Sequence, residues 1–135
     1  MKQLTPVRVL TVDDQAIYRR VAREVIVATD GFEAVGEVAS GAEVLDAVQR
    51  LAPQLVLLDV RMHGMDGIEV ARQLVACHPD VVVVLISVEE FVDMPSARQL
   101  GRLIPLVRKQ DFGPKLLRQL WSEHGNVGDA PRPAV

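Results

Sequence analysis

Apolar residues along this chain follow two patterns that alternate. Short unbroken apolar runs are typical of strands buried on both faces, and apolar residues three or four positions apart are typical of amphipathic helices. The predicted strands span residues 7–12, 34–39, 55–59, 81–86 and 103–107. The predicted helices span residues 15–28, 40–51, 68–75 and 89–101, and a last helix begins at 111 or 113. Five strand–helix repeats predict a parallel sheet with helices on both faces.

Polar residues and prolines predict where some of these elements begin and end. Asp14 is expected to cap the first helix, and Ser40 and Glu43 have the spacing of a capping box at the second. Asp66 is expected to serve as a turn or capping residue before the third helix. Pro105 lies inside the last predicted strand. Because proline has no backbone N–H, it indicates an edge position or a bulge there.

Composition narrows the class of protein. At 135 residues the chain fits one domain, and 49% hydrophobic with 24% charged residues is ordinary for a globular protein. A net charge of −3 does not indicate the basic surface that nucleic-acid binding requires. Cys77 is the only cysteine, which excludes an internal disulfide. No signal peptide is evident, and no apolar run is long enough to cross a membrane. We expect a cytoplasmic protein with a domain at 1–124 and a disordered tail at 125–135.

Four of the five predicted strands end in polar residues suited to phosphate or metal chemistry: Asp13-Asp14, Asp59, Ser87 and Lys109. The carboxyl ends of parallel strands meet at one edge of a sheet, where sites of this fold class lie. Gathered carboxylates repel one another unless a cation lies between them, and oxygen ligands favour Mg²⁺. The hydroxyl and ammonium groups could then bind the oxygens of an anion. This combination predicts phosphoryl transfer, with Asp59 as a carboxylate able to accept the group.

These residues give the chain a resemblance to the receiver domain of bacterial two-component response regulators, over roughly residues 7–122. The resemblance is carried by the residues above together with two segments, Leu57-Leu58-Asp59-Val60-Arg61-Met62 and Gly64-Met65-Asp66-Gly67. It implies a flavodoxin-like (βα)₅ fold, a doubly wound parallel sheet with strand order 2-1-3-4-5. It also implies a phosphorelay phosphoprotein rather than an enzyme acting on other substrates, since the domain catalyses only its own phosphoryl transfer and dephosphorylation.

The resemblance further implies a role for each site residue. Asp59 would form the aspartyl-phosphate, and Asp14 and Asp59 would hold Mg²⁺, with Asp13 acting directly or through water. The backbone carbonyl of Arg61 would complete the protein ligands of the metal. Ser87 would bond one phosphoryl oxygen and shift toward it, and Lys109 would pair with another.

Partners also follow from the resemblance. The phosphoryl donor would be a sensor histidine kinase or a phosphotransfer protein. The fourth helix, last strand and last helix would form a switched surface for a downstream protein partner or a homodimer. Neither a membrane nor direct nucleic-acid binding is expected within these residues.

The chain departs from the family pattern at several positions. His63 stands where proline is usual, Val88 is bulkier than the usual small residue, and Gln110 replaces a common proline. Leu106, preceded by Pro105, stands where the family usually has an aromatic residue that rotates on activation. These departures leave open an alternative, an atypical pseudo-receiver that binds proteins without being phosphorylated. A phosphatase with an aspartyl-phosphate intermediate is a third hypothesis, weakened because the chain has no cap domain.

Overall fold

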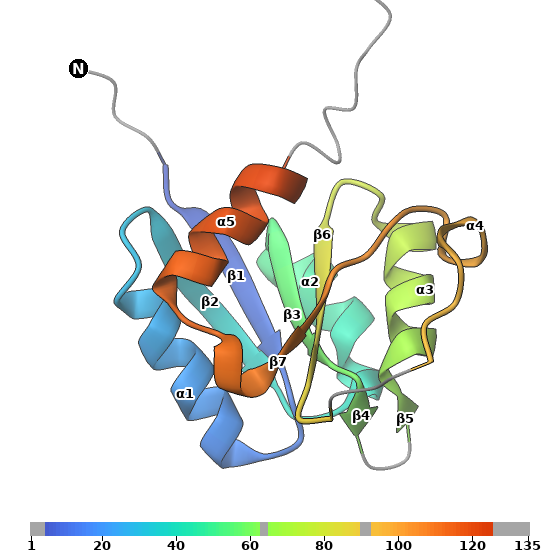
Figure 1. The fold of residues 1–135 in the computed structure, drawn as a ribbon, viewed down its shortest axis with the longest axis horizontal. Coiled ribbons are helices and arrows are strands. Elements are labelled where there is room, and N and C mark those ends of the chain that lie inside the picture. The colour runs from blue at the N-terminus through green and yellow to red at the C-terminus, as the bar shows by residue number, and fades with distance from the viewer. Residues whose placement is uncertain (1–4, 63–64, 90–92, 126–135) are drawn as a thin grey trace, which may run out of the picture.

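The computed structural model describes residues 5–62, 65–89 and 93–125. Five parallel strands form the sheet in the order β2-β1-β3-β6-β7 (Figure 1). They are β1 (Val7–Val12), β2 (Phe32–Val38), β3 (Leu55–Asp59), β6 (Val82–Ser87) and β7 (Leu106–Arg108). Counted along the sheet-forming strands, this order is 2-1-3-4-5, so the predicted flavodoxin-like fold is confirmed. A small antiparallel pair, β4 (Arg61–Met62) and β5 (Met65–Asp66), follows β3.

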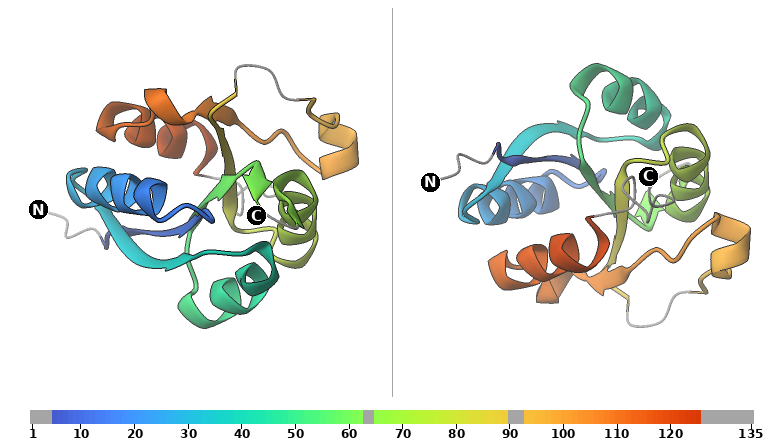
Figure 2. Two further views of the ribbon diagram at one scale, coloured as in Figure 1. Left: turned by 90° about the horizontal axis from the view of Figure 1, so that it is seen from below. Right: turned by 90° about the horizontal axis from the view of Figure 1, so that it is seen from above.

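Helices cover both faces of the sheet (Figure 2). One face carries α1 (Ala16–Val27) and α5 (Pro114–His124), and the other carries α2 (Val44–Leu51), α3 (Gly67–Cys77) and the single turn α4 (Ala97–Leu100). Short 3₁₀ turns precede α2 at Gly41–Glu43 and follow β7 at Lys109–Asp111. In the part of the chain that is described, no helix is long and apolar enough to cross a membrane.

The central strand β3 shows why its apolar run is unbroken. Val56 and Leu58 pack into the cluster beneath α2 and α3, whereas Leu55 and Leu57 pack into the cluster beneath α1 and α5. All four side chains are almost fully buried, since successive strand residues point to opposite faces and both faces are covered by helices. Asp59 ends this strand, so its position is determined by a core packed on both sides.

Close backbone packing fixes the loop that follows Asp59. The Gly67 N–H donates to the Val60 carbonyl at 2.8 Å. A Cβ on Gly67 would lie only 2.2 Å from the Asp59 carbonyl oxygen, so no other residue fits without a backbone shift. Asp66 caps α3 by accepting a hydrogen bond from the Ile68 N–H at 2.9 Å, which confirms its predicted capping role. His63 lies outside the described residues.

Two predicted helix caps were wrong. Gln15, not Asp14, is the residue that precedes α1, and its N–H donates to the Asp13 carboxylate at 2.9 Å. Ser40 and Glu43 bond to each other through their side chains at 2.7 Å rather than to backbone N–H groups. At Ser40 the side chain bonds to the Glu43 carboxylate in place of the backbone N–H that a capping box would supply.

The predicted boundaries of the fourth helix and the last strand were also wrong. Pro95 falls inside the predicted helix, which starts only after Ser96 caps it. Gly101, with φ of 86°, ends the turn. Pro105 cannot donate to the sheet, although its carbonyl accepts from the Leu85 N–H, so pairing of β7 begins at Leu106. β7 is an edge strand, as Pro105 indicated. Apart from Gly125, the predicted tail lies outside the described residues.

Candidate functional site

Three carboxylates meet at the carboxyl edge of the sheet. Val12 and Leu58 are partners in the β1–β3 register, so Asp13 and Asp59 follow side by side. One carboxylate oxygen each from Asp13, Asp14 and Asp59 lies within 4.8 Å of the others. Asp13 and Asp59 are only 4% and 6% exposed. Carboxylates this close and this buried repel one another strongly, so the arrangement favours a bound cation.

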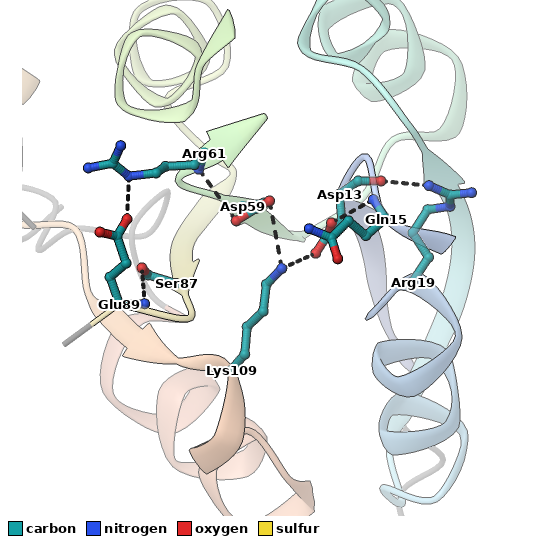
Figure 3. Close-up of polar contacts among 8 residues, drawn as sticks. All are labelled: Asp13, Gln15, Arg19, Asp59, Arg61, Ser87, Glu89 and Lys109. Carbon is teal, nitrogen blue, oxygen red and sulfur yellow. Dashed lines mark hydrogen bonds and ion pairs between the residues drawn. The ribbon is translucent and has the colours of Figure 1, made fainter. Parts of the chain in front are cut away.

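Lys109, in the turn after the edge strand β7, brings an ammonium group to these carboxylates (Figure 3). Its Nζ lies 2.7 Å from Asp13 Oδ2 and 3.6 Å from Asp59 Oδ2. Its side chain is 9% exposed, and it starts the 3₁₀ turn after β7. The predicted convergence of four strand ends therefore includes an ion-paired lysine within reach of both buried carboxylates.

The environment of Asp59 changes its acidity. Burial, followed by the charge of Asp13, raises the pKa of Asp59 from 3.8 to about 6. The Lys109 ammonium and a hydrogen bond from the Arg61 N–H, at 3.4 Å from Oδ1, act in the opposite direction, and Asp14 adds a smaller upward contribution. Asp59 is thus ionised at neutral pH at a cost in free energy that a further cation would relieve.

The loop after β6 forms the other side of the site. Ser87 is buried at the end of β6, immediately after Ile86, the register partner of Asp59. Its Oγ accepts a hydrogen bond from the Glu89 N–H at 2.9 Å, and within the described residues it makes none to Asp59. The Glu89 carboxylate forms an ion pair with the Arg61 guanidinium, which links this loop to the one after β3 (Figure 3).

Sequence reasoning missed several residues around the site. Arg19 donates to the Asp13 carbonyl at 2.7 Å and lies 3.8 Å from a Glu37 carboxylate oxygen, so it ties the loop after β1 to β2. The ring of Tyr18 lies against Lys109. The only sequence signal for either is its place near the start of the helix that follows Asp13-Asp14.

Comparison with known proteins settles the family. The family model described as the response regulator receiver domain matches residues 9–102. This chain belongs to that family. It is thus a receiver domain of the kind found in two-component signalling, as its sequence motifs predicted. These comparisons give no support to the alternative of an atypical pseudo-receiver.

The curated relatives that this chain matches are longer than the chain itself. This chain is 36% identical over 142 residues to protein-glutamate methylesterase/protein-glutamine glutaminase 5 of Myxococcus xanthus (strain DK1622), covering 97% of this chain and 40% of that protein. It is 39% identical over 90 residues to the response regulator GacA of Pseudomonas viridiflava, covering 67% and 42% respectively. The chain therefore spans about 40% of the length of these two relatives.

Solved structures agree with the fold. The receiver domain of the putative response regulator NarL from Mycobacterium tuberculosis matches with a TM-score of 0.73 and 26% identity, covering 87% of this chain and 95% of that one. The response regulator domain of Thermotoga maritima CheB also matches with a TM-score of 0.73, at 25% identity, covering 90% and 98%. The site described above therefore belongs to a receiver fold.

Proposed function

We propose that this receiver is a phosphoacceptor switch in which Asp59 takes a phosphoryl group from a sensor histidine kinase or a phosphotransfer protein. The observation that carries the proposal is the burial of two carboxylates, with a third beside them and a lysine ammonium in contact, at one edge of a parallel sheet. Structural ion pairs rarely gather three acids around one base in this way, because the uncompensated charge is costly.

The residues present fit a magnesium ion. Asp13, Asp14 and Asp59 each offer an oxygen within 4.8 Å of the other two, and such a donor set suits a hard cation that keeps several waters. We assign these three residues and the backbone carbonyl of Arg61 as its protein ligands. When bound, Mg²⁺ supplies neutralisation of the negative charge on the phosphoryl oxygens.

The protein's own groups supply positioning. A carboxylate oxygen of Asp59 attacks phosphorus while the bond from phosphorus to the donor nitrogen breaks, and the electron pair leaves with the donor. Lys109 Nζ, 3.6 Å from Asp59 Oδ2, is close enough to pair with an oxygen of the arriving group. Ser87 Oγ accepts from the Glu89 N–H, which leaves its own O–H hydrogen for another phosphoryl oxygen.

The output of the switch would be read on the side of α4, β7 and α5 by a downstream protein partner or a second copy of the domain. The open groove of about 190 Å³ beside α4 is lined by apolar residues such as Met94, Leu100 and Leu103. Leu103 is 73% exposed, and exposed apolar side chains at a groove suit protein contact. The cytoplasmic location and the absence of direct nucleic-acid binding stay predictions, as does the absence of an enzymatic activity on other substrates.

Incubation with acetyl phosphate and Mg²⁺, followed by intact-protein mass measurement, tests this function. We expect one phosphoryl adduct on the wild type, none after chelation of Mg²⁺, and none on Asp59→Asn. Asp46→Asn is the matched control, because Asp46 is an exposed carboxylate on α2 that pairs only with Arg50 among the described residues. The proposal fails if the wild type takes up no phosphoryl group or if the adduct survives Asp59→Asn.

A further inference from the structure

The Lys109 ammonium has a third neighbour besides the two carboxylates. Its Nζ lies 3.8 Å from the centre of the Tyr18 ring. Tyr18 is half-buried on the side of α1 that faces the site, and it lines the same small cavity, of about 30 Å³, as Asp13, Asp59 and Lys109. A cation this close to the face of an aromatic ring is attracted by the ring's negative face.

The ring and the carboxylates hold the ammonium in different ways. Asp13 Oδ2, at 2.7 Å, is a direct ionic partner, and Asp59 Oδ2, at 3.6 Å, is a weaker one. A ring face attracts the charge without a directional hydrogen bond, so Nζ can move from Asp13 toward Asp59 while it stays in contact with the ring. The contact also needs no further negative charge in a cluster that already holds three carboxylates.

We propose that Tyr18 is a positioning residue that keeps the Lys109 ammonium at the carboxylate cluster and lets it turn toward Asp59. Its functional consequence rests on the proposed function, because Lys109 matters for the reaction only if Asp59 is phosphorylated. The contact itself does not depend on that function. The role requires the aromatic face and not the hydroxyl group of Tyr18.

Three variants separate this role from simple filling of space. Tyr18→Phe keeps the ring face and removes the hydroxyl, whereas Tyr18→Leu and Tyr18→Met keep an apolar side chain and remove the ring. If Tyr18 only filled space, the two aliphatic variants would act equally with and without the lysine. If it acts through Lys109, their effect must vanish once Lys109 is replaced.

Proton NMR tests the contact in the unphosphorylated protein. Lysine occurs only at positions 2, 109 and 115, and Tyr18 is the only tyrosine, so few signals compete. We expect the Hε protons of one lysine, Lys109, to be shifted upfield by the ring in the wild type and in Tyr18→Phe. In Tyr18→Leu they should return to the position of an exposed lysine. Wild-type Hε signals that all lie at the exposed position would overturn the proposal.

The rate of phosphorylation by acetyl phosphate, followed by intact mass, tests the consequence. We expect Tyr18→Leu and Tyr18→Met to slow the reaction by about fivefold, the upper value for a cation–π contact at an exposed site. Tyr18→Phe should stay within about twofold of the wild type. In the Lys109→Met background, none of the three substitutions should change the residual rate further. Equal slowing by Tyr18→Phe, or equal slowing with and without Lys109, would overturn the positioning role.

The two readouts distinguish failure of this inference from failure of the proposed function. A wild type that shows the shifted Lys109 signals but takes up no phosphoryl group contradicts the proposed function and supports the contact. A wild type that is phosphorylated without the shifted signals contradicts the contact alone. Thermal unfolding followed by circular dichroism tests whether each variant is folded at the assay temperature. If Tyr18→Leu is not folded, Tyr18→Met decides the outcome.

Discussion

In this receiver, the strands β1 and β3 and the strands β6 and β7 form two sides of the carboxyl end of the sheet, and the two sides are packed differently. On the side of β1 and β3, every residue of β3 is buried and the following loop is pinned by Gly67 against the backbone of Asp59 and Val60. On the side of β6 and β7, the edge strand has three half-buried residues, and α4 is one turn long with Leu100 as its buried residue. The carboxylates belong to the first side, and the expected output surface belongs to the second.

This difference separates the carboxylate cluster from the expected output surface. Groups that must be held close against their own repulsion lie on strands packed on both faces, where local opening costs most of the global stability. On the second side β6 is fully buried, but β7 and α4 have few buried residues, so their conformation can change without unfolding the sheet. Leu106, in place of the usual aromatic residue, lies on this second side, so the departures from the family pattern there leave the carboxylate cluster in place.

Replacing one leucine by alanine on each side should give the largest difference in the free energy of unfolding. Leu58→Ala removes a fully buried side chain from the centre of the core and should lower the free energy of unfolding by about 3 kcal/mol. Leu106→Ala removes a half-buried side chain from the edge strand and should cost about 1 kcal/mol. Urea unfolding measures both. Equal losses would mean that the two sides are equally well packed.

Neutralisation of Asp59 should stabilise the protein. Because its pKa is raised to about 6 in the folded state, ionisation of Asp59 lowers stability progressively as pH rises from about 4 to about 6. Without Mg²⁺, Asp59→Asn should therefore raise the free energy of unfolding at pH 7.5 by about 2 kcal/mol, and by much less at pH 4.5. Urea unfolding at the two pH values measures this.

Asp111→Asn is the control on the side of β7. Asp111 is exposed and pairs with Arg108, so its neutralisation should leave stability within about 0.5 kcal/mol of the wild type at both pH values. A destabilised Asp59→Asn at pH 7.5 would show that the carboxylate cluster is not under repulsion.

Magnesium binding should weaken in acid. Protonation of Asp59 below its pKa of about 6 competes with the cation, so affinity should fall by about tenfold per pH unit below that value and level off above it. Isothermal titration calorimetry between pH 5 and pH 8 measures the dependence. Affinity that stays constant across this range would remove Asp59 from the proposed ligands.

The ion pair between Arg61 and Glu89 joins the two sides and should have the smallest effect. Both side chains are substantially exposed, so solvent screens the pair. Glu89→Gln should change the free energy of unfolding by less than about 0.5 kcal/mol, measured by urea unfolding. A loss above 1 kcal/mol would mean that the pair holds the two sides together.

The difference in packing between these two sides also explains which elements could be predicted from the sequence. β1 and β3 were predicted with the observed boundaries, because strands covered on both faces have unbroken apolar runs. The fourth helix was predicted too long, because Met94, Ala97 and Leu100 keep a helical spacing across Pro95. That spacing reflects burial of a few side chains and not a continuous helix.

The contacts in the site were also predictable only in part. The convergence of Asp13, Asp59 and Lys109 was predictable, since parallel strands direct their ends to one edge. The contact between Tyr18 and Lys109 was not, because it joins side chains far apart in the sequence and depends on how α1 packs beside the turn after β7. The ion pair of Arg61 and Glu89 was missed for the same reason.

The central claim is that Asp59 becomes the acyl phosphate, and reductive trapping tests it most directly. Borohydride reduces an aspartyl-phosphate to homoserine, and peptide mass spectrometry then locates the altered residue. After treatment with acetyl phosphate and Mg²⁺, we predict homoserine at position 59 and unchanged aspartate at positions 13 and 14. Homoserine at either of those two positions, with aspartate intact at 59, would contradict the account.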